Sequence, residues 1–105
     1  MAFAVKRLYQ AQLTNTLSTV LYTNPGGVTT IIKNVTVTND DNAARQVTIG
    51  WPGSAAGSAI FDALTLGVGE TVDWEGHQVL LSGETITGGC DAASKVTVHI
   101  SGVEG

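Results

Sequence analysis

The chain has 105 residues and a formal net charge of −4 at pH 7. Charged residues make up 13% of the sequence, about half of the roughly 25% that is usual in globular domains. This length predicts a single domain with a thin core. The five basic residues are scattered, which disfavours nucleic-acid binding through phosphate contacts. No apolar run is long enough to cross a membrane, so we expect no membrane partner. Scarce charge indicates an outer surface that is neutral, rich in Thr, Ser and Gly, and partly covered by other subunits.

Residues 1–17 are predicted to form an N-terminal strand or arm in front of a β-sandwich domain at residues 18–105. Apolar and polar residues between Phe3 and Leu13 alternate without a clean face, so a strand and a short helix both fit this segment. If it is a strand, we expect an edge strand or an arm that lies on something else.

A strand, a tight turn and a long strand are predicted between Thr19 and Asn39. The turn is Asn24-Pro25-Gly26-Gly27, in which proline presets the backbone and glycine accepts positive φ. In the long strand the apolar positions change parity at Lys33-Asn34, which predicts a bulge or a bend. Strands that bend in this way often cross between the sheets of a sandwich, so we expect this strand to tie two sheets together.

The following segments also fit short strands. Arg45 to Trp51 alternates cleanly with its tryptophan on the inner face, whereas Ala59 to Leu66 fits a strand or one helical turn. Between them, Pro52 to Ser58 is a loop of small residues. Gly76-His77 is predicted to break residues 71–81 into a hairpin-like or corner-turning pair.

The C-terminal third contains a short repeat. Gly69-Glu70-Thr71-Val72 and Gly83-Glu84-Thr85-Ile86 stand 14 residues apart, and each predicts a Gly-Glu turn before a strand. Gly88-Gly89 is predicted to end the second of these strands. Lys95 to Ser101 then alternates well, which predicts a final strand with Val96, Val98 and Ile100 on its inner face.

Together these segments predict an all-β fold. Seven to eight short antiparallel strands with regular turns, and no sustained helical period, indicate a single small β-sandwich or jelly-roll-like barrel with an N-terminal strand or arm.

The residues that could carry catalysis lack suitable neighbours in the sequence. His77 falls in a predicted turn, and His99 lies on the polar face of the last strand. No Gly-x-Ser-x-Gly elbow is present. Asp73 and Glu75 share a strand face and could imitate a glycosidase pair, although two solvated acids explain them more simply. We assign no catalytic residue and expect the protein not to be an enzyme.

Candidate binding residues have simpler structural explanations too. Asp40-Asp41-Asn42 could offer oxygens to calcium, but an Asx-rich turn is the commoner identity of such a segment. The single Cys90 has no partner for a disulfide or a zinc site. Trp51 and Trp74 stand in register with core valines, which favours core packing over a sugar-binding platform. We assign no metal ligand and no cofactor.

The order of motifs resembles a group of small virion proteins of tailed bacteriophages. It includes Leu21 to Gly27 (LYTNPGG), the strand Thr29 to Asn39 (TTIIKNVTVTN), Val79 to Ile86 (VLLSGETI) and the closing Val96 to Glu104 (VTVHISGVE). The resemblance covers most of residues 18–104. It rests on turns and strands and brings no catalytic residues with it.

This resemblance implies a structural role in the virion, after assembly in the host cytoplasm. Its main form is a capsid decoration (cement) protein that binds the major capsid protein or other virion subunits and stabilises the assembled head. Such a protein would be a homo-oligomer, for which a trimer is the first expectation. A neck, tail or baseplate component is the alternative. A second alternative of a different class is a carbohydrate-binding β-sandwich module that attaches to the host through exposed Trp or Tyr side chains.

Overall fold

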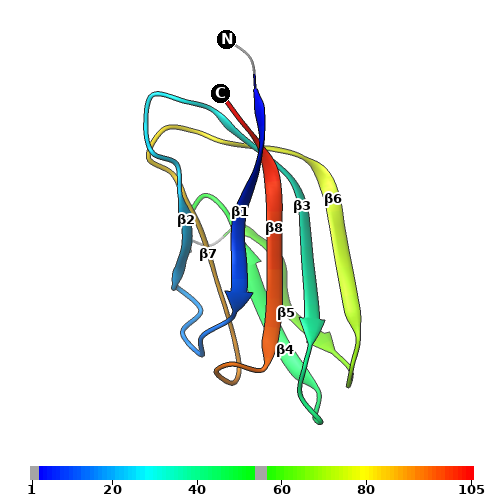
Figure 1. The fold of residues 1–105 in the computed structure, drawn as a ribbon. Coiled ribbons are helices and arrows are strands. Elements are labelled where there is room, and N and C mark those ends of the chain that lie inside the picture. The colour runs from blue at the N-terminus through cyan, green and yellow to red at the C-terminus, as the bar shows by residue number, and fades with distance from the viewer. Residues whose placement is uncertain (1–2, 54–56) are drawn as a thin grey trace.

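A computed structural model of the chain describes residues 3–53 and 57–105, and every regular element in these ranges is a β-strand (Figure 1). Residues 54–56, the middle of the loop predicted at Pro52 to Ser58, and residues 1–2 of the predicted N-terminal segment lie outside the described residues. The strands are β1 (Ala4–Gln12), β2 (Val20–Thr23), β3 (Thr30–Asn39), β4 (Arg45–Gly50), β5 (Ala59–Leu66), β6 (Thr71–Leu80), β7 (Thr85–Cys90) and β8 (Val96–Glu104).

The strands form two four-stranded antiparallel sheets. The first has the order β1-β8-β3-β6 and the second the order β2-β7-β4-β5. The first four strands therefore pair with the last four in reverse order, as in one long hairpin wrapped into a sandwich. This strand order is that of an eight-stranded jelly roll. The predicted all-β sandwich is confirmed, at the upper end of the predicted number of strands.

The core lies between the two sheets and consists of aliphatic side chains with few aromatic ones. In β8 the three predicted inward residues are fully buried, while Thr97 and His99 point outward. In β4 the inward face is likewise buried. The buried apolar residues are Leu8, Leu13, Leu21, Ile32, Val35, Val37, Val47, Ile49, Trp51, Phe61, Leu66, Leu80, Ile86, Cys90, Val96, Val98 and Ile100.

The bulge predicted at Lys33-Asn34 is confirmed. The registers of β3 with β6 and with β8 both shift between Ile32 and Asn34, so Lys33 is the extra residue. Because one residue is inserted, Ile32 before the bulge and Val35 after it both point into the core. The expectation that this strand crosses between sheets is wrong, because β3 stays in the first sheet over its whole length.

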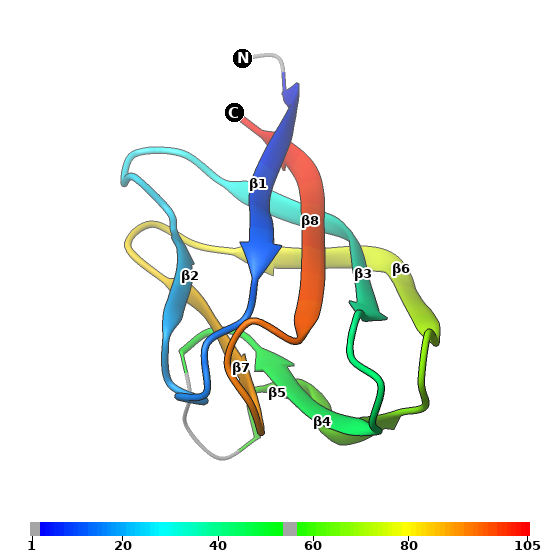
Figure 2. The same cartoon turned by 60° about the horizontal axis from the view of Figure 1, so that its bottom comes forward.

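Residues 71–81 are predicted to form a hairpin-like or corner-turning pair around Gly76-His77, but no second strand begins there. β6 is one continuous strand of 10 residues. In its pairing with β3, Gly76 and His77 have no partner residue, and they lie opposite the β3 bulge. In Figure 2, β3 and β6 run side by side and bend in the same direction. Because β3 and β6 are neighbours and both are bulged at the same level, they bend together. The residue pattern of such a bend resembles that of a chain reversal.

Two other predicted boundaries concern the second sheet. Ala59 to Leu66 is a strand rather than a helical turn. The expectation that Gly88-Gly89 ends a strand is wrong, since β7 continues to Cys90. The glycine at position 89 allows the backbone of the β1–β2 loop to pass close to β7, because a Cβ on Gly89 would lie 3.0 Å from the Cα of Leu17 in that loop.

β1 is an edge strand of the first sheet and pairs with β8 along its length. It contributes Leu8 to the core, and Leu13 follows directly after it. The beginning of β1 and the end of β8 lie at the same end of the sandwich (Figure 1). Residues 3–13 therefore pack as part of the sandwich.

The two predicted Gly-Glu turns form equivalent corners. In the first, the backbone N–H of Gly67 donates to Oε1 of Glu70 (2.8 Å), and the N–H of Asn39 donates to the carbonyl of Glu70 (2.9 Å). In the second, Leu81 donates to Oε1 of Glu84 (2.7 Å), and Asn24 donates to the carbonyl of Glu84 (2.9 Å).

Each corner is closed by a buried asparagine. The amide of Asn39 donates to the carbonyls of Ala43, Leu66 and Gly67 at 2.9–3.1 Å. The short sequence repeat thus reflects two turns that flank β6 and meet the two ends of β3.

Candidate functional site

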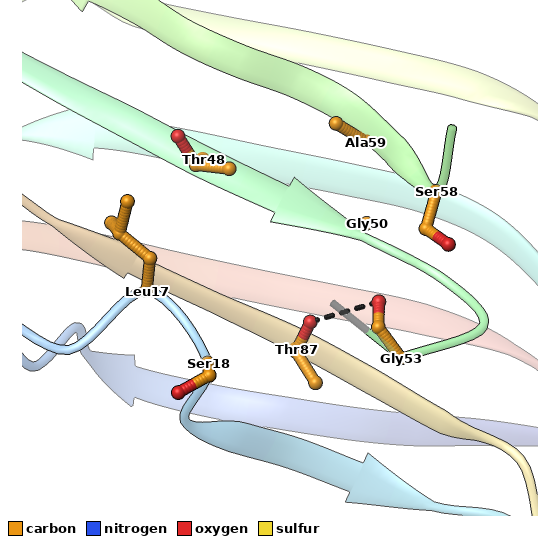
Figure 3. A pocket seen from close by; sticks show the side chains of 8 residues that line it. All are labelled: Leu17, Ser18, Thr48, Gly50, Gly53, Ser58, Ala59 and Thr87. Atoms are coloured by element: carbon orange, nitrogen blue, oxygen red, sulfur yellow. Dashed lines mark hydrogen bonds between the residues drawn. The ribbon is translucent and has the colours of Figure 1, made fainter. Parts of the chain in front are cut away.

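The outer face of the second sheet carries a hollow with a volume of about 360 Å³ (Figure 3). Its floor comes from neighbouring strands, and its rim comes from the β1–β2 loop and from Gly53 and Ser58. Most lining residues are small or carry a hydroxyl, and none is charged. They are Leu17, Ser18, Thr48, Gly50, Gly53, Ser58, Ala59 and Thr87.

The β1–β2 loop forms one wall because it is fastened to β7 by its backbone. The N–H of Gly88 donates to the carbonyl of Thr19 (3.0 Å), and that of Cys90 donates to the carbonyl of Thr14 (2.9 Å). Between these anchors the loop rises over Gly89, where a Cβ would collide with it. Leu17 is thereby held over the sheet with half of its surface exposed.

A second hollow of about 240 Å³ lies on the same face and shares Leu17 and Thr48 with the first. Its other lining residues are Asn15, Gln46, Ala63, Cys90 and Asp91. Only Asp91 is charged among the residues that line the two hollows. This face is the neutral, Thr/Ser/Gly-rich surface that the composition indicates.

Both threonine hydroxyls of the first hollow form hydrogen bonds with the backbone. Thr87 Oγ1 donates to the carbonyl of Gly53 (3.0 Å), and Thr48 Oγ1 accepts from the N–H of Ala63 (3.0 Å). Neither hydroxyl has a basic side chain among the residues that line the hollow, so this arrangement lacks the base that activates a nucleophile. Its chemistry is that of a surface that receives a side chain or loop of another molecule.

A cluster of polar side chains lies at the end of the sandwich where β1 begins. Glu104 of β8 accepts hydrogen bonds from Lys6 of β1 (2.8 Å), Thr30 of β3 (2.7 Å) and the hydroxyl of Tyr22 in β2. Lys6 also donates to the Tyr22 hydroxyl at 3.0 Å. The cluster joins the two sheets, because Tyr22 belongs to the second sheet and the other members belong to the first.

Hydrogen bonding controls the ionisation of this cluster. Burial acts to raise the pKa of Glu104, but the hydrogen bonds from Lys6, Tyr22 and Thr30 outweigh it and hold this pKa at about 2. The hydrogen bond to Glu104 in turn raises the pKa of Lys6. Both carboxylate oxygens of Glu104 accept hydrogen bonds, so we assign the cluster a structural role.

The sequence reasoning missed this cluster, although a signal for it is present. Glu104 continues the inward parity of Ile100 and Gly102. An acid at an inward position of a strand needs a partner, and Lys6 stands in the other strand that reaches this end.

The segment considered for calcium is engaged in its own loop. Asp41 accepts from Nε of Arg45 (2.7 Å) and lies 4.0 Å from Nζ of Lys95. The hydrogen bond with Arg45 lowers the pKa of Asp41. Asp40 accepts from the hydroxyl of Thr97. Among the described residues, no group of three His, Cys, Asp or Glu side chains is placed to hold a metal ion.

The histidines and the acid pair lie on the first sheet, away from the two hollows of the second sheet. His99 is exposed on the outer face of β8, and His77 is exposed beside the bulge of β6. Asp73 and Glu75 share the outer face of β6 as predicted, and Asp73 accepts a hydrogen bond from Thr36. Glu75 and His77 line a shallow hollow of about 380 Å³ beside the bulges of β3 and β6, together with Lys33, Asn34 and Gly76.

The predicted packing of the tryptophans is confirmed. Trp51 is buried, and Trp74 packs against it edge to face with ring centroids 5.3 Å apart. Neither tyrosine is fully exposed either, because Tyr9 and Tyr22 both pack against the core. The aromatic platform that the carbohydrate-binding alternative requires is therefore not formed by these four side chains. Within the described ranges, no helix is long and apolar enough to span a membrane.

Comparisons with known proteins show little similarity. No family model matches the sequence, and no curated protein matches it. Three chains of solved structures match, and one of them belongs to the structure of infectious bursal disease virus, Gx strain. The match covers 99% of this chain and 32% of that chain, with 13% sequence identity and a TM-score of 0.41. The chain thus spans about a third of the length of that protein, and similarity at this level does not bear on function.

Proposed function

We propose that this protein is a structural component of a bacteriophage virion, and specifically a decoration protein that binds the assembled head and stabilises it. The observation that carries the proposal is the strand order β1-β8-β3-β6 facing β2-β7-β4-β5. This is the jelly-roll order, an architecture used by viral capsid domains as well as by lectins and cupins. A fold alone does not define a function, so the remaining support must come from the surface and the motifs.

The surface favours a structural role over the other functions of this architecture. A cupin-type site needs metal ligands in the barrel interior, whereas His77 and His99 are exposed on the first sheet. A lectin needs exposed aromatic side chains or a polar site, whereas both tryptophans pack together. The turn and strand motifs in residues 18–104 resemble phage virion proteins. We therefore propose a protein without enzymatic activity that resides in the virion.

The two hollows around Leu17 are the surface that we assign to the shell. They are neutral apart from Asp91 and are held rigidly by backbone hydrogen bonds to β7. A loop or side chain of the major capsid protein, or of another virion subunit, would fill them. Binding to the assembled shell alone would stabilise it by mass action.

The test is binding of the purified protein to heads that lack it, measured by co-sedimentation. We expect saturation at a copy number near that of the major capsid protein. Leu17→Lys places a charge between the two hollows and should abolish binding, while Val68→Lys at another exposed apolar position should not. A few to tens of copies per particle would instead indicate a neck, tail or baseplate component. Affinity for host glycans without affinity for heads would favour the carbohydrate-binding alternative.

A further inference from the structure

The outward residues of the first sheet fall in rows that cross all four strands. One row is entirely apolar. Val5 of β1 is opposite Val103 of β8, which is opposite Ile31 of β3, which is opposite Val79 of β6. Val5 is 88% exposed and Val79 51% exposed. A complete apolar row on the outside of a sheet is unusual for a surface that only meets water.

The adjacent row extends this apolar surface toward the chain termini. Phe3 lies just before β1 and Leu81 just after β6, each two residues beyond Val5 or Val79, and the strand alternation continued to these positions places them on the same face. They are 46% and 55% exposed. Single exposed apolar residues are ordinary, but a continuous group indicates an interaction site. We call the residues Phe3, Val5, Ile31, Val79, Leu81 and Val103 the apolar end of the first sheet.

The next row carries opposite charges at its two ends. Arg7 is opposite Ser101, which is opposite Asn34, which is opposite Glu75. Three strand spacings of about 4.8 Å separate the first and last strands, so Arg7 and Glu75 are roughly 14 Å apart across the sheet. Neither forms a salt bridge with another described residue. Both side chains are exposed.

We propose that this face binds the same face of a second copy of the chain, around a two-fold axis that runs along the strands between β8 and β3 (Figure 1). This rotation places β1 over β6 of the second copy and keeps every row opposite itself. Val5 then faces Val79 of the second copy, and Arg7 faces Glu75 of the second copy. The contact is isologous, so each of these pairs occurs twice. The inference does not depend on the proposed function.

Charge complementarity is the argument for a second copy as the occupant. Under the two-fold rotation the positive end of one row meets the negative end of the same row, and the apolar row meets itself. Edge-to-edge association is disfavoured, because β1 and β6 both carry bulges and β1 points Lys6 inward. Aligned packing of two sheets, face to face, is also a common arrangement.

The area of the face limits the strength of the dimer. Four strands about 4.8 Å apart and 9 or 10 residues long, at about 3.4 Å per residue, make a face of roughly 600 Å² per copy. This gives about 1,200 Å² in total, the lower end for specific interfaces. We therefore expect a reversible dimer with a dissociation constant on the order of 10 µM.

Sedimentation velocity of the purified protein tests this proposal, at concentrations from about 1 to 500 µM that bracket the expected dissociation constant. The wild type should pass from monomer to dimer across this range. Val79→Asp should raise the dissociation constant more than tenfold. Val68→Asp, on an exposed residue outside the face, should leave it unchanged. Circular dichroism on the same samples shows whether each variant keeps its fold.

The charge pair gives the sharper test. Arg7→Glu should weaken the dimer about tenfold, because it places like charges together at two symmetric positions. The double variant Arg7→Glu/Glu75→Arg should restore the wild-type dissociation constant within about threefold. A wild type that stays monomeric over the whole range, a trimer, or a double variant that is no tighter than the single one would overturn the proposal. Loss of binding to heads would leave it unaffected, so the two proposals fail separately.

Discussion

At the scale of single residues, Glu104 is the side chain that fastens the two sheets at the terminal end of the sandwich. Its carboxylate accepts hydrogen bonds from Lys6 and Thr30 of the first sheet and from Tyr22 of the second. We expect Glu104→Gln, which keeps the shape and removes the charge, to lower the free energy of unfolding at pH 7 by about 1–2 kcal/mol. Urea unfolding followed by tryptophan fluorescence measures this difference.

The same interaction predicts a pH dependence with a defined sign. The pKa of Glu104 is about 2 in the folded protein, below its ordinary value of 4.5. A depressed folded pKa gives stability that is present above pH 4.5 and is lost as the pH falls toward 2. The difference in unfolding free energy between wild type and Glu104→Gln should therefore be constant near neutrality and shrink below pH 4.5. A difference that stayed constant down to pH 2.5 would contradict this assignment.

The two buried asparagines should contribute more to the free energy of unfolding than the size of their side chains suggests. Removing the amide of Asn39 leaves the carbonyls of Ala43, Leu66 and Gly67 without their side-chain donor. We expect Asn39→Ala to cost about 2–4 kcal/mol, because buried polar groups lose their partners. Asn42→Ala is the matched control, since that side chain is exposed in the same loop, and it should change stability by less than about 0.5 kcal/mol.

Sequence patterns reveal which residues are apolar and inward, but they reveal long-range polar partners poorly. The alternation of Val96, Val98 and Ile100 predicted the inner face of β8 correctly. The link between Lys6 and Glu104 joins residues 98 positions apart. No local period encodes such a pair, and only the pairing of β1 with β8 brings it together.

At the scale of elements, the bulge in β3 is the feature that shapes the first sheet. Gly102 is the residue of β8 that lies beside the bulge, and it pairs with Ile32 on one side and with Lys6 on the other. A Cβ on Gly102 would collide with the backbone carbonyl of Ile31 and lie 3.2 Å from the Cα of Ile32. Gly102→Ala should therefore force the two central strands apart and cost about 3 kcal/mol.

The neighbouring Ser101 offers the control for this element. Its side chain points outward, so Ser101→Ala should keep the wild-type midpoint in thermal unfolding while Gly102→Ala lowers it. Equal midpoints for wild type and Gly102→Ala would mean that β3 and β8 can separate freely at the bulge. The sequence located this bulge through the parity change, but it could not show that β6 carries a matching bulge, because pairing partners are not encoded in the parity of one strand.

β1 provides a further prediction for an element. The strand covers the edge of β8 and places Leu8 in the core. Deletion of residues 1–12 should therefore abolish the cooperative unfolding transition or move it to much lower urea, because losing one buried leucine alone costs about 2–5 kcal/mol. Fluorescence of Trp51 and Trp74, which pack on each other, reports the transition. A detachable arm would leave the transition unchanged, and that result would contradict the packing described above.

At the scale of the whole molecule, the eight strands distribute charge unevenly. The face of the second sheet around Leu17 is almost uncharged, while ion pairs gather between the β3–β4 loop, which contains Asp41, and the start of β4 at Arg45. Composition predicted a neutral surface but not its location, because location follows from which strands are neighbours. The jelly-roll order, in which the first four strands pair with the last four, sets those neighbours.

A protein that binds only an assembled shell must itself be stabilised by that shell, because linkage is reciprocal. When free binding sites on heads are present at 100 times the dissociation constant, the free energy of unfolding of the protein rises by about 2.7 kcal/mol. For a domain of this size this raises the unfolding midpoint by roughly 10 °C. Calorimetry of decorated heads, with the free protein and bare heads as controls, should show the shift. Glu104→Gln lowers stability at a site away from the hollows. Its unfolding midpoint should therefore rise on heads by the same amount as that of the wild type. If the midpoint of the protein were the same on and off the particle, the proposed decoration role would be untenable.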